Sequence, residues 1–336
     1  MNPGDLLTLT IEKVAHGGFC VARFKGVVIF VRHALPGEVV EAQLLALAPG
    51  KKSWFAQTIN VLTSSPQRVK SKCEFFKADG CGGCDWQHTT AKYQQELKLE
   101  VLIEQLTRFG QVENAAEICT MHAVEPSQDY WRSRIRLVAA ENGAWGFRKF
   151  RSHEIQEIDK CLIADEKINQ VLSTLEPGIE NDEVLIVNSK DETIVYPVED
   201  RQRNTPAAIQ EVDGHDFSVA GDGFWQVHPA AASTLSNAIK NEIKDATINS
   251  FADLYAGVGV LAHAVLQIHP NAKATVVESD RNASNKAIDN LAAFKTVKVF
   301  SDRVDRWVNK VKFDFDLVVL DPPRSGAGQN VMRKIC

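Results

Sequence analysis

The sequence lacks long apolar runs. Its longest apolar stretches, such as 27–31 and 317–320, are the size of a strand, whereas a membrane-spanning helix needs about 20 apolar residues. The N-terminal stretch MNPGDLLTLTIEK has neither the basic nor the apolar region of a secretory signal. We therefore expect no membrane-spanning segment, and a cytoplasmic protein whose thiols stay reduced.

Internal repeats, low-complexity tracts and coiled-coil heptads are also absent. Hydrophobic residues make up 44% of the chain and charged residues 24%, and the 6 Trp and 16 Phe add bulky apolar side chains. This composition supplies real cores and excludes a disordered chain. At about 150 residues per domain, the length suggests two domains or three small ones.

A uniform excess of positive charge is absent, because the formal net charge is -5. The charge is unevenly distributed, however. Residues 1–72 carry nine Lys and Arg against four Asp and Glu, and residues 130–151 carry six against one. Residues 152–222 carry five against seventeen. One acidic stretch thus accounts for the negative net charge, and the two basic stretches are compatible with a polyanionic partner.

Two kinds of periodicity divide the chain. Residues 6–62 alternate apolar and polar positions between turns with Gly and Pro, which predicts a small β-barrel. Residues 91–109 have helical spacing, and residues 131–200 return to a strand-like pattern. From about residue 230, helices and strands alternate, which predicts a parallel α/β sheet. The expected helices are 230–244, 259–268 and 281–294, and the expected strands are 249–254, 273–277, 297–300 and 315–320.

A turn with two glycines follows the first strand of this α/β part. The run DLYAGVG ends a strand and opens a helix, so Gly257 and Gly259 would let the backbone approach a ligand closely. Glu278 ends the next strand, where a carboxylate can accept hydrogen bonds from both ribose hydroxyls. Asp302 and Asp321, the latter in the run DPPR, follow two further strands. Four signals at one sheet edge favour a nucleoside site over a plain α/β domain, and without GxGxxG an NAD site is less suitable than an S-adenosylmethionine site.

Three of the seven cysteines cluster as Cys73, Cys81 and Cys84, and Cys161 lies further along the chain. Four thiolates can form a tetrahedral sulfur site, which suits zinc or a [4Fe-4S] cluster. A zinc ribbon usually has two CxxC pairs, and this sequence has one. The pattern favours a metal site over unrelated core thiols.

Arg132, Arg134 and Arg136 alternate along an expected strand, so all three should share one face. With Arg148 and Lys149 they would form a basic surface interleaved with aromatic residues, as binding of single-stranded RNA requires. Solvated surface charge is the alternative for any single arginine. Taken as a set, these residues favour RNA binding.

These motifs resemble the RNA uracil-5-methyltransferases, specifically the type with an N-terminal TRAM domain and an iron-sulfur cluster that makes 5-methyluridine in 23S ribosomal RNA. The resemblance runs through the chain in order. It covers the barrel, the four cysteines, YWRSR at 130–134, GFR at 146–148, FWQVH at 224–228, DLYAGVG and DPPR.

The resemblance implies a multidomain α/β plus β architecture. The implied domains are an OB-like TRAM β-barrel (1–64), a central, mostly β iron-sulfur and RNA-binding domain (65–90 and 125–215), and a Rossmann-like class I methyltransferase domain (91–124 and 216–336). It assigns S-adenosylmethionine to Gln226, Tyr255, Gly257, Gly259, Glu278, Asp302 and Asp321, and a [4Fe-4S] cluster to Cys73, Cys81, Cys84 and Cys161. We expect RNA to be the partner of a monomeric enzyme.

The sequence departs from the family pattern in four respects. Seven residues rather than five separate the first two cluster cysteines, His228 replaces the usual Asn, and Ala256 replaces a common Cys. The family's nucleophilic Cys and its base Glu lie beyond the position of Cys336, so we expect a truncated chain that binds RNA and cofactor without turnover. The alternatives are a transfer RNA substrate and a non-catalytic RNA-binding protein. A radical enzyme would need Cx3Cx2C on a barrel fold, and the sequence has neither.

Overall fold

The computed structural model describes residues 1–50, 52–198 and 206–336. The chain forms two compact units, each built from several segments. Unit 1 consists of Met1–Asp129, Leu137–Leu162 and Glu176–Asn181, and unit 2 consists of Tyr130–Arg136, Ile163–Leu175 and Asp182–Cys336. Within the described ranges, no helix combines the length and the apolar character needed to cross a bilayer.

Unit 1 begins with a closed five-stranded barrel in the order β1-β2-β3-β5-β4. The strands are β1 (Leu6–Val14), β2 (Cys20–Phe24), β3 (Val27–Arg32), β4 (Val39–Leu47) and β5 (Ser53–Thr63). Because successive strand residues point to opposite faces, alternate residues fill the barrel. Leu9 and Ile11 of β1 and Ile29 and Val31 of β3 are buried in one core cluster. The barrel predicted over residues 6–62 is confirmed.

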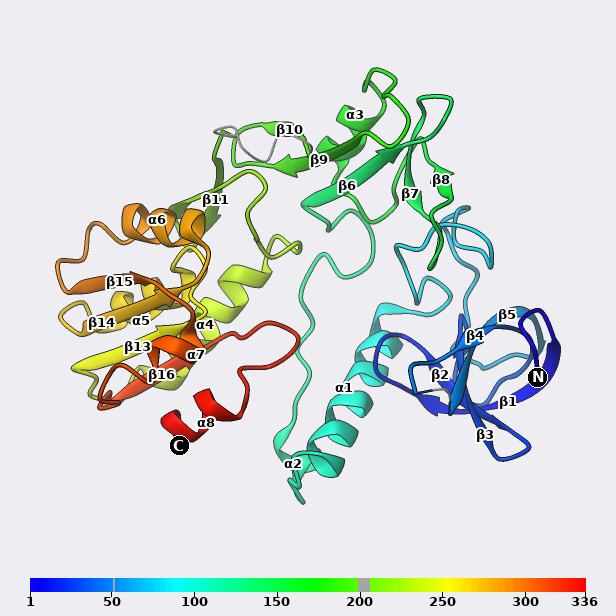
Figure 1. Cartoon of the computed structure of the whole chain (residues 1–336), viewed down its shortest axis with the longest axis horizontal. Coiled ribbons are helices and arrows are strands. Elements are labelled where there is room, and N and C mark those ends of the chain that lie inside the picture. Colours follow the sequence, from blue (N-terminus) through cyan, green and yellow to red (C-terminus); the bar gives the residue numbers. More distant parts are fainter. Residues whose placement is uncertain (51, 199–205) are drawn as a thin grey trace. The chain divides into compact units, whose positions relative to one another are not determined.

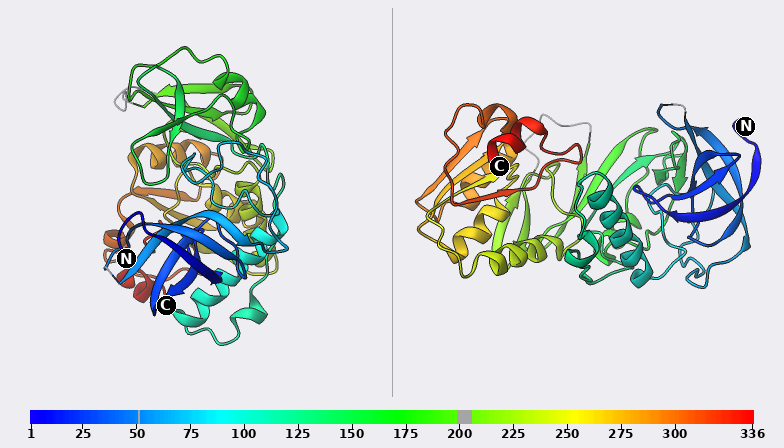
Figure 2. Two further views of the ribbon diagram at one scale, coloured as in Figure 1. Left: turned by 90° about the vertical axis from the view of Figure 1, so that its right-hand side faces the viewer. Right: turned by 90° about the horizontal axis from the view of Figure 1, so that it is seen from below.

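The long helix of unit 1 packs on this barrel (Figure 2). Leu97, the buried residue of α1 (Ala91–Arg108), clusters with Val14 and Leu35 of the barrel segment. The resemblance implies that 91–124 belongs to the methyltransferase domain, whereas this segment lies in unit 1. The difference arises because barrel residues far away in sequence cover the apolar side of this helix.

The remainder of unit 1 contains the cysteine loop (residues 73–86) and short antiparallel strands. Its elements are α2 (Ala115–Ile118), β6 (Arg134–Ala139), which enters this unit at Leu137, β7 (Trp145–Arg148) and β8 (Ile155–Glu157). Val138 of β6 pairs with Gly146 of β7, and Phe147 of β7 pairs with Gln156 of β8.

Unit 2 contains a parallel sheet in the order β15-β14-β13-β16, with helices on both faces (Figure 1). Its elements are α4 (Ala231–Ile243), β13 (Ser250–Leu254), α5 (Val260–Ile268), β14 (Lys273–Glu278), α6 (Arg281–Asn290), β15 (Val297–Ser301), α7 (Val304–Trp307), β16 (Leu317–Leu320) and α8 (Gln329–Ile335). Phe251 and Val276 face a core with α4, α5 and α6, whereas Ala252 and Val277 face α7 and α8. The predicted alternation is confirmed, although α6 ends at Asn290, earlier than expected.

Short antiparallel hairpins complete the description of unit 2. The elements are α3 (Glu166–Leu172), β9 (Glu183–Asn188) paired with β10 (Thr193–Pro197), and β11 (Ala208–Val212) paired with β12 (His215–Val219). Phe217 of β12 packs with Trp225 and Val258 of the α/β part. The expected domain boundary between 215 and 216 would divide this hairpin, and residues 199–205 of the expected central domain lie outside the described residues.

Candidate functional site

The turn after β13, the glycine loop (residues 255–259), has several residues with positive φ. Tyr255 has a φ of 63° and Gly257 a φ of 57°, and a non-glycine residue rarely adopts such a conformation. A Cβ at Gly257 would meet no atom within 4 Å, so this glycine faces open space. A Cβ at Gly259 would lie 2.9 Å from Leu291, so this glycine allows close helix packing. The loop therefore leaves room for a ligand at the start of α5.

Glu278, at the end of β14, is bonded to this loop. Its Oε2 accepts a hydrogen bond from the Gly257 amide at 2.9 Å. The Asp302 amide donates to the backbone carbonyl of Glu278 at 3.0 Å, and the Asp321 amide donates to the Leu254 carbonyl at 3.4 Å. The three carboxylates predicted to bind a cofactor therefore lie at the ends of β14, β15 and β16, at one edge of the sheet, where open α/β sheets bind ligands.

Asp302 has a cationic neighbour. Lys310 Nζ lies 2.5 Å from its Oδ2, and the Arg303 amide donates to its Oδ1 at 2.8 Å. The hydrogen bond from Lys310 lowers the pKa of the Asp302 carboxyl. Asp302 consequently stays ionised and keeps lone pairs that can accept hydrogen bonds from a ligand.

Asp253 is a site residue to which sequence reasoning gave no role. It is fully buried on β13, its Oδ2 accepts the Ala262 amide at 2.8 Å, and its Oδ1 has no partner among the described residues. Burial, together with the charges of Asp321 and Glu278, raises the pKa of Asp253 to about 7. This carboxyl ties β13 to the first turn of α5 behind the glycine loop. The available signal was an acid within the otherwise apolar strand FADL.

The segment FWQVH lies against the glycine loop. Trp225 is buried in a cluster with Val258, the residue between the two glycines. The amide and the hydroxyl of Ser133 both donate to the Val227 carbonyl, at 2.8 and 2.9 Å. Gln226 lies in sequence between these two anchored residues.

Arg134, predicted to share an open basic face with Arg132 and Arg136, is only 9% exposed. Its Nη1 donates to the Gly223 carbonyl at 2.5 Å and its Nη2 to the Gly221 carbonyl at 3.4 Å. Burial lowers the pKa of this guanidinium. The backbone that leads into FWQVH covers Arg134, which makes it a positioning residue for that segment.

Arg132 and Arg136 are more accessible than Arg134. Arg136 is exposed, and its Nε lies 3.2 Å from Glu183 Oε2. Arg132 is half-buried and its guanidinium lies 5.9 Å from the centre of the Trp131 ring. A cation in an exposed ion pair can exchange its carboxylate partner for a phosphate, because surface ion pairs are weak.

Arg148 and Lys149 attach the cysteine loop to β7 within unit 1. The backbone of Cys81 forms an isolated antiparallel β-bridge with that of Lys149, and the Gly82 amide donates to the Arg148 carbonyl at 3.2 Å. A Cβ at Gly82 would lie 2.9 Å from that carbonyl, so the first glycine of CGGC allows the approach. Lys149 Nζ also lies 2.8 Å from Glu154 Oε2.

The four cysteines predicted as metal ligands all lie in unit 1, and none forms a disulfide among the described residues. Burial raises the pKa of the Cys84 thiol to about 11, and the charges of Cys161, Cys81 and Cys73 raise it as well, so the four are electrostatic neighbours. The Gly83 amide lies 3.3 Å from Cys81 Sγ. Among the described residues, no set of three or more His, Cys, Asp or Glu side chains has the geometry of a metal-ion site. The thiols are gathered without being arranged around an ion.

Comparison with known proteins agrees with this arrangement. A family model of the TRAM domain matches residues 2–55, and a model of the methyltransferase small domain matches residues 230–335. An uncharacterized RNA methyltransferase of Streptomyces coelicolor is 33% identical over 99% of this chain and 81% of its own length. Similarly named proteins of Streptomyces avermitilis and Corynebacterium efficiens are 33% and 30% identical, covering 99% and 100% of this chain and 86% and 83% of their own lengths.

The barrel and the sheet-edge site thus define a methyltransferase with an N-terminal TRAM domain. The chain belongs to the family of RNA methyltransferases that these relatives represent. The family resemblance drawn from the motifs is confirmed at this level.

Proposed function

We propose that this protein methylates carbon 5 of a uracil in RNA, with 23S ribosomal RNA as the substrate and S-adenosylmethionine as the methyl donor. The observation that carries the proposal is that Trp225 of FWQVH packs in one cluster with Val258 of the glycine loop, while the Asp321 amide of DPPR donates to the Leu254 carbonyl just before that loop. This arrangement suits a reaction in which a planar base lies next to a nucleoside cofactor.

The residues at the sheet edge fit S-adenosylmethionine. Glu278 would accept hydrogen bonds from the ribose hydroxyls, and the open space at Gly257 would admit the cofactor close to the backbone. The remaining contacts would come from Gln226, Tyr255, Gly259, Asp302 and Asp321. When bound, the cofactor supplies an electrophilic methyl group on a sulfonium.

Uracil carbon 5 is a poor nucleophile until it is activated. A thiolate that adds to carbon 6 breaks the double bond and gives an enolate, whose carbon 5 takes the methyl group. A base then removes the proton from carbon 5, the double bond returns, and the thiolate leaves. We assign neither role to Cys336, the cysteine of unit 2, because the resemblance places the nucleophile beyond a further strand.

We infer that the four thiols of the cysteine site hold a [4Fe-4S] cluster. Cys73, Cys81, Cys84 and Cys161 offer four thiolates, and the Gly83 amide already points at one sulfur, as amides around such clusters do. When bound, the cluster would join the loop to residue 161 as a structural element. Zinc is the competing occupant of the same thiols.

The decisive experiment is deletion of the gene in its host, followed by mass spectrometry of nucleosides from separated ribosomal and transfer RNA. We expect loss of one 5-methyluridine from 23S ribosomal RNA, restored by a plasmid copy of the gene. Loss from transfer RNA instead would identify the other substrate class. Unchanged 5-methyluridine in both RNAs, or loss of a different methylated nucleoside, would contradict the proposal.

A further inference from the structure

Arg32, the last residue of β3, is a buried charge with an unused donor. It is 1% exposed, its Nη2 donates to the Cys84 carbonyl at 3.0 Å, and its Nε donates to Asp85 Oδ1 at 3.2 Å. Its guanidinium lies 4.1 Å from the centre of the Phe150 ring. Its Nη1 has no hydrogen-bond partner among the described residues. A buried cation of this kind costs free energy unless negative charge lies nearby.

The negative charge beside Arg32 comes from the cysteine loop. Asp85 supplies a carboxylate next to Arg32, and Cys81 and Cys84 would add negative charge to the same surroundings as metal-bound thiolates. Asp85 is 45% exposed, so water screens it and it compensates the buried guanidinium only in part. The thiolates of the proposed metal site would therefore be the second source of negative charge for the Arg32 guanidinium.

The loop is also attached to the barrel at a second point. The Trp86 indole Nε1 donates to the Gly18 carbonyl at 3.1 Å. A Cβ at Gly18 would lie 2.9 Å from Asp85, so the barrel backbone and the loop approach closely. Arg32 thus acts across a packed contact within unit 1.

We propose that Arg32 is a positioning residue for the metal site: it fixes the Cys84 backbone and balances the charge of the thiolates and of the metal group they hold. This inference rests on the proposed cluster at Cys73, Cys81, Cys84 and Cys161. The barrel therefore contributes a charged group to the cysteine loop. Stable binding of iron would then require a properly folded barrel.

Two measurable properties follow from this role. Reduction adds an electron to a cluster, so a nearby positive charge favours the reduced form and makes the midpoint potential less negative. Loss of a group that orients a metal ligand typically weakens metal binding about 10- to 100-fold. Removing Arg32 should therefore lower the potential and speed the loss of iron.

The test uses anaerobically purified protein of the full chain. Arg32→Met and Arg32→Lys are compared with the wild type and with Arg23→Gln, which removes an exposed arginine of β2 that pairs with Glu12. Arg32→Met should release iron to a chelator roughly tenfold faster and shift the midpoint potential to more negative values. Arg32→Lys should release iron faster but keep a potential near that of the wild type, because it retains the charge. The Arg23 control should match the wild type in both measurements.

Asp85→Asn is the second variant if Arg32→Met fails to fold. Asp85 is partly exposed, and loss of its carboxylate leaves the guanidinium charge free to act on the cluster. The midpoint potential should then become less negative than in the wild type. Equal potentials and equal iron-release rates in all variants would overturn the inference while leaving the cluster in place. Wild-type protein that binds no iron would contradict the proposed cluster and the inference with it.

Discussion

Asn290, the last residue of α6, donates from Nδ2 to the backbone carbonyl of Val258 at 3.0 Å. The same side chain bonds both backbone groups of Ser218 on β12: Nδ2 donates to the carbonyl at 3.1 Å, and Oδ1 accepts from the amide at 2.8 Å. One amide side chain thus fixes the hairpin and the residue between the two loop glycines.

Asn290→Asp should weaken the glycine loop. The substitution replaces a donor that faces two carbonyls with an acceptor, and a buried group left unsatisfied costs about 1–3 kcal/mol. We expect a lower free energy of unfolding and S-adenosylmethionine binding weakened about tenfold, measured by calorimetry. Asn285→Asp, at an exposed position of the same helix, is the control. Unchanged affinity in a destabilised Asn290→Asp protein would mean that the loop is positioned by other contacts.

Glu278→Ala should weaken S-adenosylmethionine binding. It removes the proposed acceptor for the ribose hydroxyls, and hydrogen bonds to a charged group contribute about 1.5–3 kcal/mol, roughly 10- to 100-fold in affinity. Titration calorimetry measures the change. Glu242→Ala, at an exposed position of α4, should bind like the wild type. An affinity unaltered by loss of Glu278 would show that the ribose lies elsewhere.

The cysteine site should bind iron. Anaerobically purified protein should be brown, with about four irons per chain. Cys161→Ser should lose most of this iron, whereas Cys119→Ser, at the end of α2 and outside the four predicted ligands, should retain it. Metal analysis and the visible absorption spectrum report both results. Stoichiometric zinc without iron would reject the cluster.

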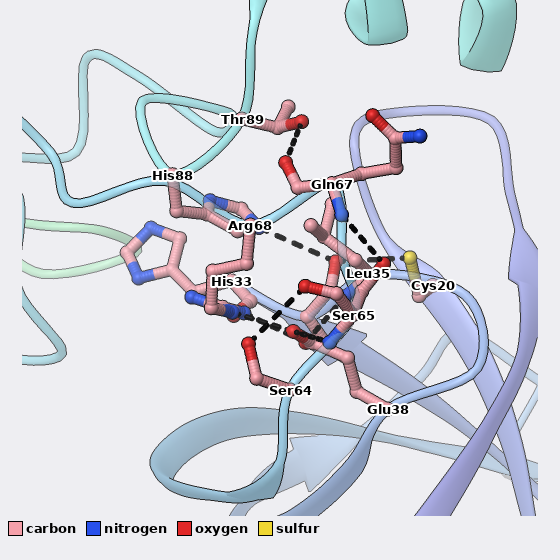
Figure 3. Close-up of polar contacts among 11 residues, drawn as sticks. Cys20, His33, Leu35, Glu38, Ser64, Ser65, Gln67, Arg68, His88 and Thr89 are labelled. Carbon is pink, nitrogen blue, oxygen red and sulfur yellow. Dashed lines mark hydrogen bonds and ion pairs between the residues drawn. The ribbon is translucent and has the colours of Figure 1, made fainter.

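Glu38 and Arg68 form an ion pair in unit 1 that should make stability depend on pH (Figure 3). Glu38 is fully buried, and its carboxylate also accepts the Leu35 and Ser65 amides at 2.9 and 3.1 Å. Burial would raise the pKa of Glu38, but the hydrogen bonds from Arg68 and the two amides outweigh it and lower the pKa. The stabilisation is therefore fully present above the ordinary value of 4.5 and is lost as the pH falls through the lowered value.

Urea denaturation at neutral pH and near pH 4 tests this pair. Glu38→Ala leaves Arg68 without its partner and should cost about 3–5 kcal/mol at neutral pH, with a smaller difference from the wild type in acid. Glu12→Gln, at an exposed position of β1, should show the pH dependence of the wild type. A Glu38→Ala deficit that is the same at both pH values would mean that packing, not charge, is responsible.

Arg134 and Arg136 should respond differently to replacement. Arg134→Met should lower the melting temperature and leave the salt dependence of RNA binding unchanged, because the guanidinium holds backbone carbonyls. Arg136→Met should reduce the slope of log affinity against log salt by about 1 with little effect on melting. Filter binding over a range of salt concentrations measures the slope. The opposite pattern would show that Arg134 contacts RNA.

The sequence was sufficient where periodicity and chain order determine structure. Alternation over residues 6–62 defined the barrel, and the change to helical spacing after residue 230 defined the parallel sheet. Carboxylates at the ends of successive strands could be placed at one edge, because parallel strands share that edge.

The burial of a side chain by residues that are distant in sequence could not be predicted. Arg134 and Arg136 are two residues apart on β6, yet only Arg134 is buried, because the distant carbonyls of Gly221 and Gly223 bond it. Arg32 and Asp253 were missed for the same reason. Their roles depend on partners that no local pattern of residues indicates.

The interleaved composition of the two units has a consequence for synthesis of the chain. Unit 2 needs the segments 130–136 and 163–175, which leave the ribosome before the residues from 182 onward that make its sheet. The barrel can close early, whereas these short segments, which pair with each other at Arg132 and Ala164, lack the rest of unit 2 until the later part of the chain emerges. Folding of unit 2 is therefore delayed until late in translation, and cutting the chain at any single peptide bond cannot yield both units intact.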